Sequence, residues 1–223
     1  RKLALTNKQG EHIGIVGRKG SGKSTLEKNL LNLYPEYEGS IRFGKTDMQR
    51  INPAALRKKV FLYPQDVYVF NGTIKENIML ANLDADIEDV IRAAKLADLH
   101  DFVTKQYLGY NYKIGDLGAN LSGGQKLKLG FARLFLSDPD LIILDEASSM
   151  LDVESEQKIM NYINCHFKDN SIICIAHLIH TLRNADRIWV IDEGQIVQEG
   201  SHETLMQVQD GLYYGFMKTY IAY

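Results

Sequence analysis

The sequence predicts an α/β fold in which helices cover a mostly parallel β-sheet. Short apolar runs that are rich in β-branched residues and bounded by glycine or charged residues are typical of buried strands. They occupy residues 12–16, 60–63, 141–144, 172–176 and 188–191. Segments with helical periodicity alternate with these runs, which favours a parallel sheet. Because the runs are apolar on both faces, we expect a sheet that is covered on both sides.

Apolar stripes at helical spacing predict the helices that flank the strands. Two such stripes are Leu26, Leu30 and Leu33, which Tyr34-Pro35 should end, and Ile159, Ile163 and Phe167. The segment 73–136 contains few strand-like runs, and Ile87, Val90, Ile91 and Ala94 share one helical face there. We therefore expect a helical subdomain inserted at 73–136 into a core of about 1–72 and 137–223. Residues 37–63, with "GSIRFG", should form a small antiparallel β subdomain.

The composition sets limits on the function. The chain has 223 residues, 45% of them hydrophobic and 24% charged, and a formal net charge of 26 − 28 = −2. This is typical of a globular domain, and the charge gives no reason to expect a nucleic-acid partner. We find no apolar run long enough to insert into a membrane, and no signal peptide. Because the chain begins with Arg1 rather than Met, we expect a fragment of a longer protein.

A glycine-rich stretch links the first predicted strand to the first predicted helix. It consists of Gly17, Arg18, Lys19, Gly20, Ser21, Gly22, Lys23, Ser24 and Thr25, and matches the P-loop pattern G-x-x-x-x-G-K-[ST]. Glycines let successive N–H groups point into one concavity, and the helix N-terminus adds partial positive charge. We expect Lys23 to reach the β- and γ-phosphates and Ser24 to offer its hydroxyl to Mg²⁺. A strand–helix turn without a ligand is the disfavoured alternative.

Two further stretches extend this site. "LIILDE" places Asp145 and Glu146 at the end of an apolar strand, where ligands bind in open α/β sheets. We expect Asp145 to hold Mg²⁺ through water and Glu146 to act as the general base toward the attacking water. "LSGGQ", residues 121–125, opens another helix with Ser122 as a suitable N-cap. On physical grounds alone it is equally well a capped helix or a second anion site.

In order, "GRKGSGKST", "YPQD", "LSGGQ", "LIILDE", "SSMLD" and "IAH" closely resemble the ATP-binding-cassette (ABC) ATPases over essentially the whole chain. The resemblance implies one nucleotide-binding domain over 1–223 with a RecA-like P-loop core. It also implies that two such domains pair head to tail, with ATP between the P-loop of one and the "LSGGQ" of the other.

The resemblance assigns roles to residues outside the P-loop. Ser122, Gly123, Gly124 and Gln125 would bind the ATP that is held by the partner domain. Gln65 would approach Mg²⁺ and the attacking water, and Asp152 would couple the two sites. His177 would contact the γ-phosphate and position the water.

The stretches "YVFNGTIKENI" (68–78) and "IGDLGANLSGGQ" (114–125) resemble ABC exporters, in which a membrane domain usually shares the chain. The implied function is ATP hydrolysis that powers export of a substrate. The implied location is the cytoplasmic face of the membrane, beside a transmembrane domain. ATP and Mg²⁺ are the implied cofactors.

The sequence departs from the exporter pattern in three places. Residues 1–16 lack the aromatic residue that stacks on adenine, so we expect ATP binding to be weaker, since a base stack is worth ~1–3 kcal/mol. Leu178 follows His177, and Lys126 follows "LSGGQ" (the family's signature segment, residues 121–125), and arginine is common at both positions. Neither change removes a catalytic group, and we expect an active site.

Other functions are less well supported. DNA-repair and chromosome-organising ABC proteins usually carry a long coiled coil between the P-loop and "LSGGQ", and no heptad run occurs there in this sequence. A module that closes on ATP without hydrolysis is disfavoured by Lys23, Asp145, Glu146 and His177. A stand-alone importer ATPase is disfavoured by "NGTIKENI".

Overall fold

The computed structural model describes residues 5–34, 36–145, 151–175 and 182–221. It divides into two compact units. The first contains residues 1–62, 139–146 and 169–223, and the second contains residues 63–138 and 147–168.

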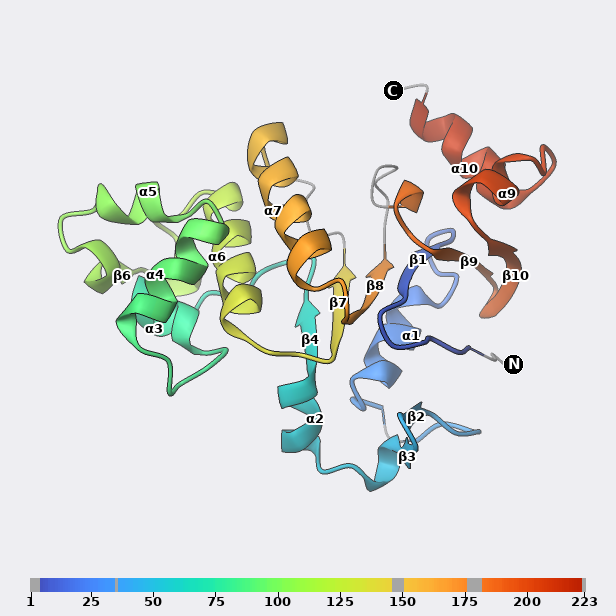
Figure 1. The fold of residues 1–223 in the computed structure, drawn as a ribbon, viewed down its shortest axis with the longest axis horizontal. Coiled ribbons are helices and arrows are strands. Elements are labelled where there is room, and N and C mark those ends of the chain that lie inside the picture. Colours follow the sequence, from blue (N-terminus) through green and yellow to red (C-terminus); the bar gives the residue numbers. More distant parts are fainter. Residues whose placement is uncertain (1–4, 35, 146–150, 176–181, 222–223) are drawn as a thin grey trace. The chain divides into compact units, whose positions relative to one another are not determined.

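A six-stranded sheet is the centre of the first unit (Figure 1). Its order is β10-β9-β1-β8-β7-β4. The strands are β1 (His12–Val16), β4 (Val60–Tyr63), β7 (Leu141–Asp145), β8 (Ser171–Ile175), β9 (Arg187–Asp192) and β10 (Gln195–Gly200). β1 pairs in parallel with β8 and β9, and β7 pairs in parallel with β8, whereas β10 is antiparallel to β9. The predicted mostly parallel sheet is confirmed.

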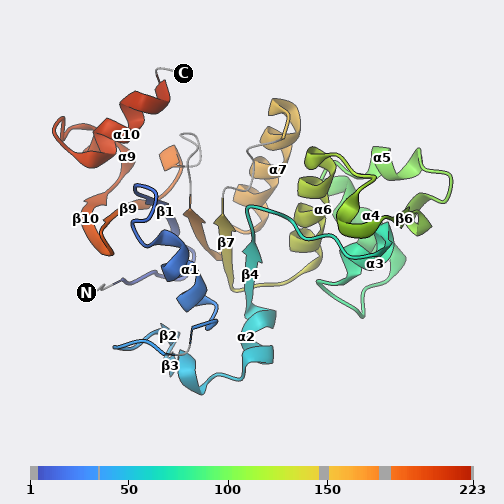
Figure 2. The same cartoon turned by 180° about the vertical axis from the view of Figure 1, so that it is seen from behind.

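Helices pack against both faces of the sheet within this unit (Figures 1 and 2). On one face, Trp189 and Ile191 of β9 pack with Leu26 of α1 (Lys23–Leu30) and with α2 (Pro53–Lys59). On the other, the alternate residues Ile188 and Val190 pack with α9 (His202–Met206) and α10 (Leu212–Ile221). The period-2 alternation of β9 explains why one strand serves both layers.

Two elements of this unit are shorter than the sequence predicts. Helix α1 ends at Leu30, because Asn32 adopts a left-handed φ of 53°, and Leu33 lies outside the helix with 53% of its surface exposed. Leu33 therefore does not extend the buried stripe. The antiparallel patch is only the pair β2 (Arg42–Phe43) and β3 (Thr46–Asp47). Other parts of 37–63 form the 3₁₀ turn η1 (Met48–Arg50), α2 and strand β4 of the main sheet, and loops connect them.

The second unit is mainly helical. It contains α3 (Ile74–Met79), α4 (Ile87–Leu96), α5 (His100–Thr104), α6 (Gly123–Leu136) and α7 (Val153–His166). The 3₁₀ turns η2 (Gly109–Asn111) and η3 (Asp116–Gly118) and the short pair β5 (Gly72–Thr73) and β6 (Lys113–Ile114) connect them. Tyr63 stacks on Phe131 of α6 at 4.3 Å between ring centroids and donates a hydrogen bond to the Leu127 carbonyl at 2.9 Å. The predicted helical insertion is present, and within the described ranges no helix is long and apolar enough to cross a bilayer.

Candidate functional site

The glycine-rich loop leaves β1 at Val16 and enters α1 at Lys23. Gly20 and Gly22 have φ angles of 80° and 107°, which favour glycine. A Cβ on Gly17 would lie 2.1 Å from the Ile191 carbonyl oxygen, so the loop fits there only without a side chain. The Gly194 N–H, in the β9–β10 turn, donates to the Ser21 carbonyl at 2.8 Å. The loop is therefore fixed against the sheet.

The start of helix α1 is built to meet an anion. Its N-cap, Gly22, supplies no side-chain hydrogen bond to the first turn, and the first N–H groups of a helix have no partner within the helix. The Lys23 ammonium donates to the carbonyl oxygens of Gly17 at 2.7 Å and Arg18 at 3.0 Å. The ammonium thus lies across the loop, where its full charge adds to that of the helix dipole.

Two carboxyl groups meet beside this helix. Asp145 ends β7 and is paired in register with Ile175 of β8. The carboxyl of Glu27, on α1, is buried and forms a hydrogen bond with that of Asp145. Burial, then repulsion by Asp145, then this hydrogen bond raise the pKa of Glu27 to about 7. Because Ser24 and Glu27 are three residues apart on one helix, they share a face.

The sequence analysis proposed Ser24 and Asp145 as metal ligands and did not point to Glu27. The available signal was a glutamate one turn after Ser24 in the half-buried stripe of an amphipathic helix. The hydroxyl of Ser24 and the carboxylate of Asp145 are the hard oxygen ligands that Mg²⁺ prefers. In the part of the chain that the structure describes, no group of three or more His, Cys, Asp or Glu residues is placed to hold a metal.

We expect Glu27→Gln to stabilise the chain at high pH when no Mg²⁺ is present. The folded-state pKa of Glu27 lies above its usual 4.5, so its contribution to stability is fully present below pH 4.5 and lost as pH rises through about 7. Glutamine has no proton to lose. The variant's unfolding free energy relative to the parent should therefore rise by roughly 2–3 kcal/mol between pH 4.5 and pH 8.

Urea unfolding in EDTA at several pH values measures this difference. Glu38→Gln, an exposed position in a loop, is the control and should show no such trend. A Glu27→Gln difference that stays constant with pH would show that neither burial nor Asp145 raises the pKa of Glu27.

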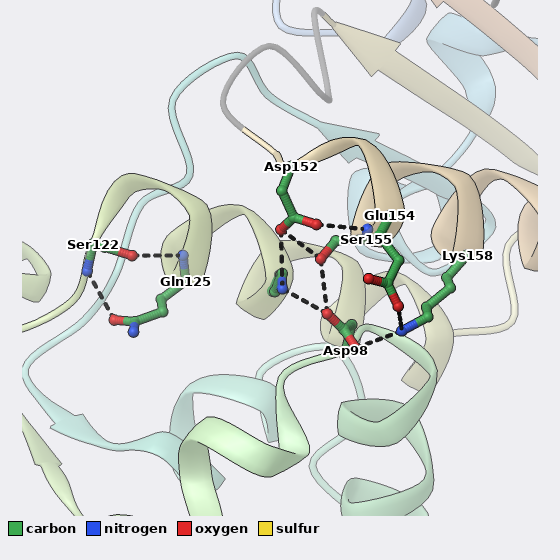
Figure 3. Close-up of polar contacts among 8 residues, drawn as sticks. Asp98, Ser122, Gln125, Asp152, Glu154, Ser155 and Lys158 are labelled. Carbon is green, nitrogen blue, oxygen red and sulfur yellow. Dashed lines mark hydrogen bonds and ion pairs between the residues drawn. The ribbon is translucent and has the colours of Figure 1, made fainter.

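The signature segment forms a capping box at the start of α6 (Figure 3). The Ser122 hydroxyl accepts from the Gln125 N–H at 3.2 Å, and the Ser122 N–H donates to Gln125 Oε1 at 2.9 Å. The capped-helix interpretation is therefore what the structure contains. The box occupies the N–H of Gln125, so Gly123 and Gly124 carry the backbone donors that remain for an anion.

Asp152 caps the next long helix, α7. Its Oδ1 accepts from the Ser155 N–H at 2.9 Å, and its Oδ2 accepts from the Ser155 hydroxyl at 2.6 Å. These hydrogen bonds lower the pKa of Asp152 to about 2, so its carboxylate is ionised at neutral pH. Lys126, which follows the signature, donates to the Leu117 carbonyl at 2.9 Å.

The predicted site residues fall into three groups. Gly17–Thr25 and Asp145 lie in the first unit, where Glu27 links α1 to the end of β7. Ser122–Gln125, Asp152 and the exposed Gln65 lie in the second unit. Glu146 and His177 lie outside the described residues.

Comparison with known proteins shows which family the chain resembles. The family described as ABC transporter matches residues 1–149. The chain is 45% identical over 212 residues to the exotoxin translocation ATP-binding protein PaxB of Pasteurella aerogenes, covering 94% of this chain and 30% of PaxB. It is 44% identical over 211 residues to the alpha-hemolysin translocation ATP-binding protein HlyB of Escherichia coli, covering 95% of this chain and 30% of HlyB. A bacterial Atm1-family ABC exporter with ATP bound matches the fold with a TM-score of 0.93 and 33% identity, over 98% of this chain and 38% of that one.

Proposed function

Because the chain belongs to the ABC transporter family, as its motifs predicted, we propose that it is the ATP-binding and ATP-hydrolysing domain of a membrane exporter. The chain spans 30% of the length of PaxB and of HlyB. Their names refer to translocation, which supports export over DNA repair. By the same names, an exported toxin is the cargo class that we favour.

The observation that carries this proposal is the start of α1. Gly22 has a left-handed backbone and gives no side-chain cap, and the Lys23 ammonium donates to the carbonyl oxygens of Gly17 and Arg18 in the same loop. An anion with several oxygens, such as the triphosphate of ATP, is the kind of ligand that such a helix start binds. In our proposal Gly17–Thr25 hold the phosphates.

The remaining roles follow from the family. Ser24, Asp145 and Gln65 would hold Mg²⁺, which when bound neutralises charge on the phosphate oxygens. Glu146 takes a proton from the attacking water, and His177 orients that water against the γ-phosphate.

The partners that we propose are a second nucleotide-binding domain and a transmembrane domain. Ser122–Gln125 and Asp152 of one copy would face the ATP held by the P-loop of the other. The chain would then act at the cytoplasmic face of a membrane.

We expect the purified chain to release phosphate from ATP with Mg²⁺ and to stop when EDTA removes the metal. An assay of inorganic phosphate at rising protein concentration measures this, and a rate per chain that rises with concentration indicates a working dimer. ATP-dependent dimerisation without phosphate release would instead indicate a module that closes without hydrolysis. Strong stimulation by DNA would indicate a repair-type ATPase.

A further inference from the structure

A cluster of charged side chains joins three segments of the second unit (Figure 3). Asp98 follows α4, Lys128 lies on α6, and Asp152 and Ser155 lie at the start of α7. Asp98 has a φ of 55°, a left-handed conformation that an aspartate adopts less readily than glycine does. A carboxylate at a position where glycine would suit the backbone better indicates that the side chain itself is used.

The distances show how closely the cluster is connected. Asp98 Oδ2 accepts from Lys128 Nζ at 2.6 Å and from the Ser155 hydroxyl at 2.8 Å. The same hydroxyl is 2.6 Å from Asp152 Oδ2, and Lys128 Nζ is 3.7 Å from that oxygen. The Lys128 side chain is 17% exposed and Ser155 is 3% exposed. Lys128 is thus the cation that both carboxylates share.

The single proton of Ser155 explains why the cation is needed. A hydroxyl can donate to only one of the two carboxylates at a time. Burial opposes ionisation of Asp98, but hydrogen bonds from Lys128 and Ser155 outweigh it and lower its pKa, and the pKa of Asp152 is lowered as well. The carboxylates of Asp98 and Asp152 are therefore both anionic. Without Lys128 they would repel each other across the Ser155 hydroxyl that lies between them.

We propose that Lys128 and Asp98 are positioning residues. They hold the Asp152 turn, by which we mean Asp152 and the first turn of α7, to the signature helix α6. This inference rests on the proposed function, in which Ser122–Gln125 and Asp152 face the nucleotide of the partner. Lys128 lies six residues after Ser122 on the same helix, about 9 Å along its axis. Because Lys128 pairs with Asp98 and Asp152, it holds the start of α6 and the start of α7 in a fixed arrangement before nucleotide binds. Small displacements of groups that position a substrate slow catalysis strongly.

Lys128→Met and Lys128→Arg test the proposal in the full chain. Methionine keeps the apolar stem of the side chain and removes the positive charge, whereas arginine keeps the positive charge. We expect Lys128→Met to lower phosphate release at least tenfold while the dissociation constant for ATP at the chain's own P-loop stays unchanged. Lys128→Arg should recover most of the rate. Lys158→Met is the control, because that side chain is 55% exposed and pairs more closely with Glu154, at 2.8 Å, than with Asp98, at 3.7 Å. It should leave the rate near that of the parent, since an exposed ion pair contributes little.

A second measurement does not depend on ATP. Amide hydrogen exchange at Ser155, whose N–H is bonded to Asp152, should speed up at least tenfold in Lys128→Met but not in Lys128→Arg. The proposal would be overturned if Ser155 exchanged in Lys128→Met at the rate of the parent. It would also be overturned if the parent released phosphate and Lys128→Met released it at the same rate. If the parent itself releases no phosphate, the proposed function fails, and the exchange rates still decide whether Lys128 holds the Asp152 turn.

Discussion

Replacing Glu146 by glutamine should lower phosphate release by about 10²–10⁴-fold, the range that a general base contributes. Glutamine keeps the size and hydrogen-bonding capacity of the side chain but cannot take a proton from water. Glu146 lies outside the described residues, and the prediction rests on its place directly after Asp145, the last residue of β7. ATP binding should persist, because the P-loop is unchanged.

Single-turnover phosphate release and size-exclusion chromatography with ATP measure the two parts of this prediction. The variant should accumulate as an ATP-bound dimer, because the dimer reopens only after ATP is hydrolysed and the variant cannot hydrolyse it. Glu88→Gln, an exposed position on α4, is the control and should behave as the parent does. Parental turnover in Glu146→Gln would mean that another group is the base.

Replacing Lys23 by alanine should weaken ATP binding by roughly ten- to a hundredfold. Hydrogen bonds to charged groups are worth about 1.5–3 kcal/mol, and each 1.4 kcal/mol is a factor of ten in affinity. The change also leaves the carbonyls of Gly17 and Arg18 without the ammonium that they contact.

Calorimetric titration with ATP and with AMP separates the phosphate contribution from the rest of the nucleotide. The loss should be large for ATP and small for AMP, because Lys23 is expected to reach the β- and γ-phosphates. Lys45→Ala, exposed between β2 and β3, is the control. Equal losses for both nucleotides would show that Lys23 only supports the loop.

Local patterns predicted most of the fold. Apolar runs such as 12–16 and 141–144 identify strands, because a strand that is buried on both faces is apolar at every position. The P-loop was readable because its glycines and Lys23 are contiguous. The end of α1 could not be predicted in this way, because it depends on the left-handed backbone conformation of Asn32 rather than on the apolar stripe.

Contacts between distant residues account for what the sequence did not reveal. Nothing local to Glu27 indicates that it meets Asp145, and nothing near Asp98 indicates that Lys128 and Ser155 converge on it. These pairs lie tens of residues apart and are brought together by packing of the helices and strands. Single-sequence patterns report the face of an element but not its partner.

The head-to-tail arrangement can be tested with two inactive variants. Lys23→Ala disables the P-loop, and Ser122→Arg disables the signature. In a head-to-tail dimer of one copy of each, the intact P-loop of one chain meets the intact signature of the other. Mixing the two proteins should therefore restore phosphate release well above that of either alone. A mixture as inactive as its components would contradict a nucleotide site that is shared between two chains.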